Sequence, residues 1–176
     1  MTFRKPKMSK NPILEELVYD QSSGSLRYKG VRYLLIRPET ITGFQKAFPE
    51  SCGKEAEGGL FEGGYTGGSL SAKKYRDIHN FSDHEILEFM MNMGNQIGWG
   101  HFSLDRYDPT EKHLCVSVEH SPFAQAYGAS SHGVCHLIRG VLAGTAAVLF
   151  AGDCTAQEVE CQARGDEKCR FVIEGQ

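Results

Sequence analysis

The sequence predicts a mixed α/β fold of the α+β kind, in one domain of antiparallel strands and packed helices. Its 176 residues are a usual length for a single domain. Apolar residues alternate near both ends, as in strands, and recur every three or four residues in between, as in helices. The expected order is hairpin, helices, strands, helix and hairpin, and such elements bury their apolar faces by packing in layers.

The first residues are expected to form a tail before a hairpin. Residues 1–24 look irregular and end in a turn-like Gln-Ser-Ser-Gly. The domain then covers residues 25–176. It opens with alternating residues 25–28 and 31–36 on either side of a Lys-Gly turn, a pattern typical of a β-hairpin.

Two helices have clear start signals. Pro38 suits the first turn of a helix that runs to about Phe48 and is ended by Pro49. Ser82 and Glu85 form a capping box, which predicts a second, amphipathic helix behind them.

A glycine-rich stretch, residues 58–68, is predicted to be helical. Its glycines recur every four residues, and residues four apart share a helix face. Each glycine costs about 1 kcal/mol relative to alanine in a helix, so we expect another backbone to pack closely against it. A flexible loop is the alternative, and a P-loop is disfavoured because no Gly-Lys-Ser/Thr follows. The two registers are Gly59, Gly63 and Gly67, continued by Ser71, and Gly64 and Gly68, continued by Ala72.

The C-terminal part is expected to hold strands around a long helix with small residues for close packing. The elements are strands at residues 99–104 and 114–118, a helix from about 132 to 150, and a hairpin of residues 156–162 and 169–173 that turns at Gly165.

Cysteines cluster in this C-terminal part. Cys161 and Cys169 flank the hairpin turn, and Glu158 precedes them on the same hairpin. Cys135 lies near the start of the preceding helix and could complete a four-ligand shell. Three thiolates and a carboxylate suit tetrahedral Zn²⁺ in a closed, structural site, and they disfavour Mg²⁺ or Ca²⁺.

Other ligand sets remain open. Cys154 is a rival ligand, and Asp153 and His136 lie near the same element ends. Cys52 and Cys115 have no sequence partners and are expected to be small buried side chains.

Apolar and aromatic residues upstream of this cluster are candidates for a small-molecule pocket, which needs apolar walls and a few polar groups. The same residues could instead form ordinary core. No recognisable catalytic or hydride-donor motif is present, which favours a binding protein over an enzyme and leaves the question open. The candidates are Phe89, Met93, Trp99, His101, Phe123, Tyr127 and His132.

Residues 133–144 (GVCHLIRGVLAG) and 158–171 (EVECQARGDEKCRF) resemble the 4-vinyl reductase domain family of predicted hydrocarbon-binding proteins. They also resemble the related sensor domains of phenol-responsive bacterial activators. The resemblance implies a zinc ion held by Cys135, Glu158, Cys161 and Cys169. It further implies a fold like that of subunits of the TRAPP vesicle-tethering complex, a homodimer, and a small-molecule pocket beside the long helix. Ala156 replaces an aromatic residue of the phenol sensors, which disfavours phenol itself as ligand.

We therefore expect a zinc-stabilised binding domain for a hydrophobic or aromatic small molecule, with a sensory or carrier role. One alternative is an accessory protein of (bacterio)chlorophyll or tetrapyrrole biosynthesis. Another is a protein-interaction scaffold subunit. A net charge of −3 gives no overall positive field for nucleic acid. No apolar run is long enough to span a membrane, and no secretory signal is recognisable, so a cytoplasmic location with reduced cysteines is expected.

Overall fold

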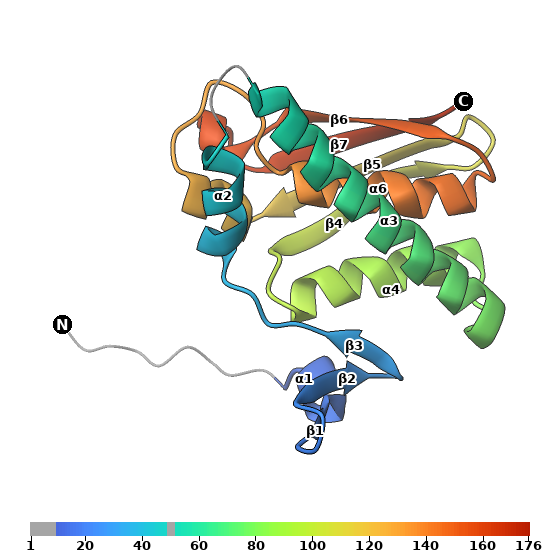
Figure 1. Ribbon diagram of the computed structural model, residues 1–176. Coiled ribbons are helices and arrows are strands. Elements are labelled where there is room, and N and C mark those ends of the chain that lie inside the picture. The colour runs from blue at the N-terminus through green and yellow to red at the C-terminus, as the bar shows by residue number, and fades with distance from the viewer. Residues whose placement is uncertain (1–9, 49–51) are drawn as a thin grey trace, which may run out of the picture. The chain divides into compact units, whose positions relative to one another are not determined.

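The computed structural model describes residues 10–48 and 52–176, and the chain divides into two compact units after Ile36 (Figure 1). The sequence placed its boundary after residue 24 instead. The expected hairpin therefore belongs to the first unit. That unit holds an antiparallel sheet in the order β1-β2-β3. Its elements are α1 (Pro12–Glu16), β1 (Val18–Asp20), β2 (Ser25–Tyr28) and β3 (Val31–Tyr33).

The hairpin itself is confirmed, because β2 and β3 pair around the Lys-Gly turn. The expectation that residues up to 24 are irregular is wrong for residues 12–20, and residues 1–9 lie outside the described part. Asn11 caps α1 by accepting from the Leu14 N–H, and Pro12 occupies the first turn. An Asn-Pro pair is a recognised helix start, and this signal was overlooked.

The second unit, residues 37–176, is layered. A four-stranded antiparallel sheet has the order β4-β5-β7-β6. Helix α6 contacts both strands β6 and β7 and helix α3, so it forms the layer between the sheet and α3 (Figure 1). The helices are α2 (Pro38–Lys46), α3 (Gly53–His79), α4 (Asp83–Gln96), α5 (Pro122–Tyr127) and α6 (His136–Leu149). The strands are β4 (His101–Asp108), β5 (His113–Glu119), β6 (Cys154–Glu160) and β7 (Cys169–Gly175), with a 3₁₀ turn, η2 (Gln162–Arg164), before β7.

The expected helices, strands and terminal hairpin of this unit are present. The capping box of α4 forms, with Ser82 and Glu85 bonded to each other's backbone. Helix α2 ends at Lys46, and the proposed stop at Pro49 lies outside the described residues. None of the helices within the described ranges has both the length and the apolar character needed to cross a bilayer.

The core lies between the sheet and α6. Alternate residues of β5 and β7 point inward and are fully buried, which is the period of two expected for a half-covered sheet. The buried strand residues include Leu114, Val116, Val118, Phe171 and Ile173.

The glycine-rich stretch forms part of one long helix, α3, as predicted. Only one of its two registers faces α6. A Cβ at Gly64 or Gly68 would overlap backbone carbonyls of Leu137 or Val141. The contact is reciprocal, because Cβ atoms at the α6 glycines 140 and 144 would overlap carbonyls of α3. The two helix backbones therefore touch directly. In the other register, Gly59, Gly63 and Gly67 face open space.

Candidate metal centre

Four potential metal ligands meet where α6 approaches the β6–β7 hairpin. Their ligand atoms all lie within 4.8 Å of one another, and Cys135 Sγ is 3.7 Å from Cys169 Sγ. Zn–S bonds of about 2.3 Å in a tetrahedron place sulfur atoms about 3.8 Å apart, so the spacing suits a metal ion. The group could hold a metal, as the sequence predicted. It is called the Cys3Glu cluster below and consists of Cys135, Glu158, Cys161 and Cys169.

The hairpin turn sets the positions of two of the thiols. Cys161 follows β6 and Cys169 begins β7, with η2 between them. Asp166 accepts from the Cys161 N–H at 2.8 Å, and Gly165 ends the turn with φ +97°, which favours glycine. The Gln162 N–H points at Cys169 Sγ from 3.4 Å. The backbone thus bends around the position that an ion would take.

Cys135 reaches the cluster from the start of α6. Its N–H donates to Glu158 Oε2 at 2.9 Å, and its Sγ lies 3.2 Å from Ser121 Oγ. A Cβ on Gly133 would come within 2.6 Å of the same carboxylate oxygen, so glycine leaves room for Glu158 there. Ser121 and Gly133 were missed, since neither carries a motif that spacing reveals.

Because the Cys3Glu cluster is buried, a charge there without a partner of opposite sign is energetically unfavourable. Glu158 Oε1 is buried and has no hydrogen-bond partner among the described residues. Burial raises the pKa of Glu158 to about 8. The Cys135 and Cys169 thiols donate hydrogen bonds to Cys161, and these bonds lower the pKa of Cys161. The pKa of Cys135 is raised, because its thiol keeps its proton to make this bond. A divalent cation would compensate several of these groups at once, and the donor set fits a thiophilic metal.

The remaining cysteines lie outside the cluster. Cys154 is at the opposite end of β6 and directs its Sγ at the Gly152 carbonyl, so the rival ligand assignment is wrong for this arrangement. Cys115 is half-buried beside Asp105. Cys52 is exposed, so the expectation of burial is wrong there. All six cysteines, each within the described ranges, are unbridged.

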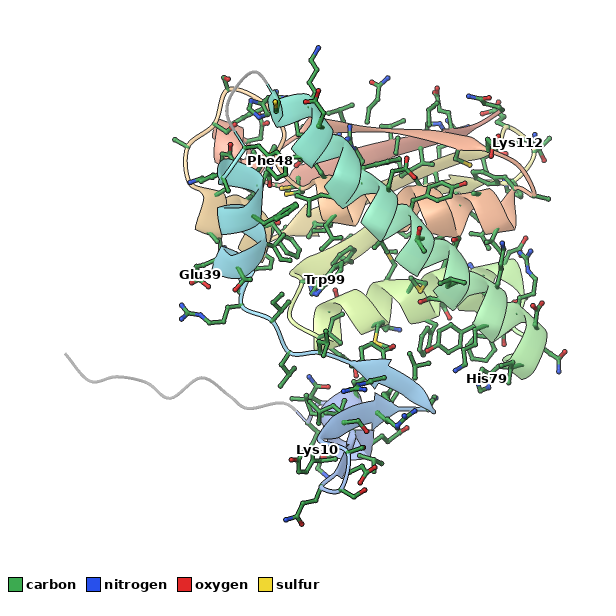
Figure 2. The ribbon with its side chains drawn as sticks, viewed as in Figure 1. Lys10, Glu39, Phe48, His79, Trp99 and Lys112 are labelled. Carbon is green, nitrogen blue, oxygen red and sulfur yellow. The ribbon has the colours of Figure 1, made fainter. Side chains whose placement is uncertain are left out.

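The aromatic residues predicted to line a pocket pack on neighbouring rings. Trp99, labelled in Figure 2 between α4 and β4, makes an edge contact with Phe123 at 5.4 Å. Phe89 lies 4.1 Å from Tyr75, ring centre to ring centre, and Met93 is buried in α4.

The three other predicted pocket residues lie nearer the surface. Tyr127 carries the Lys46 ammonium 4.5 Å above its ring. His101 is exposed at the start of β4, and His132 is half-exposed with its Nε2 3.4 Å from Glu57 Oε1. The seven residues predicted to line one pocket therefore make their contacts in several separate places.

A cleft of about 390 Å³ lies elsewhere, along the second half of α3 and the end of α6. Its walls are mixed polar and apolar, and Arg76 donates there to the Val148 carbonyl at 2.9 Å and to Asp83 at 2.6 Å. None of the seven predicted pocket residues lines it. Its walls include Tyr65, Ser69, Lys73, Arg76, Val148 and Asp153.

His136, the first residue of α6, is a buried polar residue next to the cluster. Burial lowers its pKa to about 4, helped by the charge of Arg139, so the imidazole is neutral at pH 7. Arg139 lies one turn further along α6, with its guanidinium 5.0 Å from the Phe61 ring centre.

Comparison with known proteins gives a family match and several solved structures of similar fold. Residues 114–175 match the V4R domain. No curated protein sequence matches the chain. The fold is similar to the phenol-responsive sensory domain of the transcription activator PoxR, solved with phenol. The TM-score is 0.79 at 20% identity, over 93% of this chain and 87% of that one.

Two further solved structures share the fold. A vinyl-4-reductase family protein from Methanocaldococcus jannaschii has a TM-score of 0.56 at 19% identity, over 82% of this chain and 84% of that one. Trafficking protein particle complex subunit 3 from Naegleria fowleri was solved covalently bound to palmitic acid. Its TM-score is 0.51 at 11% identity, over 79% of this chain and 95% of that one. The fold is thus shared with the PoxR sensory domain and the trafficking-complex subunit. Residues 114–175, which match the V4R domain, contain the whole Cys3Glu cluster, and over this segment the resemblance to the 4-vinyl reductase family is confirmed.

Proposed function

We propose that this chain is a zinc-stabilised domain that binds a small hydrophobic or aromatic molecule, in a sensory or carrier role. The observation that carries the proposal is the Cys3Glu cluster inside the segment that matches the V4R domain. The fold shared with a sensory domain solved with phenol supports the ligand class.

Zinc is the ion that the donor set favours. Three thiolates and one carboxylate make a closed tetrahedral shell, which leaves no position for substrate and is typical of structural zinc. Bound there, zinc would join the start of α6 to both strands of the terminal hairpin.

Metal analysis of gently purified protein tests the zinc part of the proposal. We expect one zinc per chain by mass spectrometry, and its loss from Cys161→Ser. Cys154→Ser is the matched control, because Cys154 is on the same hairpin but outside the cluster. Purified protein without zinc, or Cys161→Ser that retains it, would contradict the zinc assignment.

Ligand binding is proposed near the predicted pocket residues, which are mostly apolar as in other small-molecule sites. Because Trp99 and Phe123 pack on each other, a ligand that binds there has to separate their rings. Native mass spectrometry should show an additional organic mass that disappears on denaturation. Trp99 is the only tryptophan, so its fluorescence reports the same event. We further propose a homodimer, to be measured by light scattering.

A scaffold subunit that acts through protein contacts is the second candidate. The mutual packing of Trp99 and Phe123 favours it, because a filled core needs no ligand. The fold shared with a trafficking-complex subunit is consistent with it. This candidate predicts zinc without any organic mass and a Trp99 spectrum that small aromatic and aliphatic molecules leave unchanged.

A further inference from the structure

Three further side chains of metal-ligating type approach one another around the starts of α3 and α6. Glu57, near the start of α3, has its Oε1 3.4 Å from His132 Nε2 and 3.7 Å from His136 Nε2. Ligand atoms bonded at about 2.1 Å to one divalent ion lie roughly 3.4 Å apart in a tetrahedron. Each imidazole therefore faces the same carboxylate oxygen at nearly the spacing of metal ligands, but the two ring nitrogens are not close enough to each other to complete a three-ligand group in the described structure.

His136 supplies an independent sign of a missing partner. Its side chain is 6% exposed, and neither ring nitrogen has a hydrogen-bond partner among the described residues. Buried polar groups are nearly always partnered, so an imidazole in this state calls for an explanation. A metal ion on Nε2 provides one, since a neutral imidazole nitrogen is a common ligand.

His132 is oriented by the polypeptide that carries it. Its Nδ1 lies 3.4 Å from Ser130 Oγ, and its backbone N–H donates to the same oxygen at 3.2 Å. With the imidazole proton on Nδ1 and donated to Ser130 Oγ, Nε2 keeps the lone pair that can bind a metal. The side chain is half-exposed, which gives an ion and its water ligands access.

Two nearby charged groups have opposite effects on the binding of a cation at this place. Arg139 is close enough to interact with both Glu57 and Glu158, and its positive charge disfavours a second cation. The Cys3Glu centre acts in the other direction. Four anionic ligands around a divalent ion leave an excess of two negative charges, of which Arg139 offsets one. This electrostatic argument rests on the proposed zinc centre, whereas the geometry of the three side chains does not.

We propose that Glu57, His132 and His136 form a second metal site for a borderline divalent ion such as Zn²⁺, Ni²⁺ or Co²⁺, completed by water. The half-exposed His132 ring is the movable member that closes the site. The ion would link the start of α3 to the start of α6.

Cobalt binding tests the proposal, because the two sites differ in spectrum. The protein as purified is dialysed against Co²⁺, and bound zinc and cobalt are counted by mass spectrometry. We expect one cobalt per chain in addition to zinc, with weak visible d–d bands and no thiolate-to-cobalt charge transfer. His132→Ala and Glu57→Gln should each weaken cobalt binding at least about 10-fold and leave zinc unchanged. Both residues are more exposed than His136, so these variants avoid disturbing the buried start of α6.

His84→Ala is the matched control. His84 Nε2 lies 3.4 Å from Glu88 Oε1, the same pair geometry without a third ligand and on an exposed face. The proposal is overturned if the wild type binds no second ion, if both variants keep it, or if the control loses it equally. Failure of the zinc centre looks different. The purified protein would then lack zinc, and cobalt entering the Cys3Glu cluster would show charge-transfer bands that His132→Ala leaves intact.

Discussion

The backbone N–H of Cys135 donates to Glu158 Oε2 at 2.9 Å, which ties the start of α6 directly to strand β6. A ligand residue on the helix and a ligand residue on the sheet are therefore positioned by each other. The remaining two ligands are positioned by the hairpin turn. Preorganisation of this kind lowers the conformational cost of binding an ion.

Gly133→Ala should weaken metal binding. The added methyl group would come within 2.6 Å of Glu158 Oε2 and push the carboxylate out of place. Outer-shell changes typically cost 10–100-fold in metal affinity, and we expect a loss of about that size in a chelator competition assay. Gly43→Ala, where a Cβ meets no atom within 4 Å, is the control. Equal zinc affinity in the two variants would show that the space beside Glu158 is unimportant.

Removal of the metal should destabilise the second unit. In Cys161→Ser, the free energy of unfolding is expected to fall by more than about 4 kcal/mol, because the ion links α6 to two strands and loss of a metal is among the largest single-site effects. Urea unfolding followed by far-UV circular dichroism measures it. Chelation of the wild type should reproduce the loss, while Cys154→Ser should leave stability within about 1 kcal/mol. A stable chelated protein would mean that the cluster is not structural.

Acidification should destabilise the fold through His136. Its pKa is lowered from 6.5 to about 4, so between these values the unfolded chain binds a proton that the folded chain does not. The contribution to stability is complete above pH 6.5 and is lost as the pH falls toward 4, by up to about 3 kcal/mol. The stability of the wild type relative to His136→Phe should decline over this range in urea unfolding. If the difference between the two is constant with pH, His136 is not buried in its neutral form.

The two glycine registers of α3 should respond oppositely to alanine. Gly68→Ala places a methyl group against the Val141 carbonyl and should destabilise the protein by about 2–3 kcal/mol. Gly67→Ala faces open space and should stabilise by about 0.5–1 kcal/mol through helix propensity alone. The two substitutions lie at neighbouring positions of the same helix, so the difference between their thermal stabilities measures the effect of packing against α6. Similar effects of both would contradict the direct contact between α3 and α6.

Most of the fold could be predicted because its signals are local. The Ser82–Glu85 capping box, the Lys-Gly turn and the period-four glycines each specify a structure within a few residues. The choice between the two glycine registers could not be predicted, since it depends on which face meets α6. The pairing of β1 with the hairpin was missed because a three-residue strand has too little pattern to recognise.

The metal cluster was predictable for a similar reason. Cys161 and Cys169 flank one hairpin turn, so their proximity follows from the turn, and only Cys135 needed a tertiary contact. The ligand pocket had no such local signal. Aromatic residues at helical spacing look alike whether they line a cavity or fill a core, and Phe89 and Trp99 pack on other rings. The meeting of Glu57 with His132 and His136 joins segments distant in sequence, and no spacing rule reveals it.

The direct contact between α3 and α6 also bears on the order of folding. Helix α3 contains seven glycines in 27 residues, and each one widens the conformational freedom of the unfolded segment. Such a segment has too little intrinsic helicity to form a stable helix alone in water. Helix α6 has the same handicap to a smaller degree, with two glycines in 14 residues. The long helix of this protein therefore depends on the shorter one, and α3 is expected to become helical only as it docks on α6.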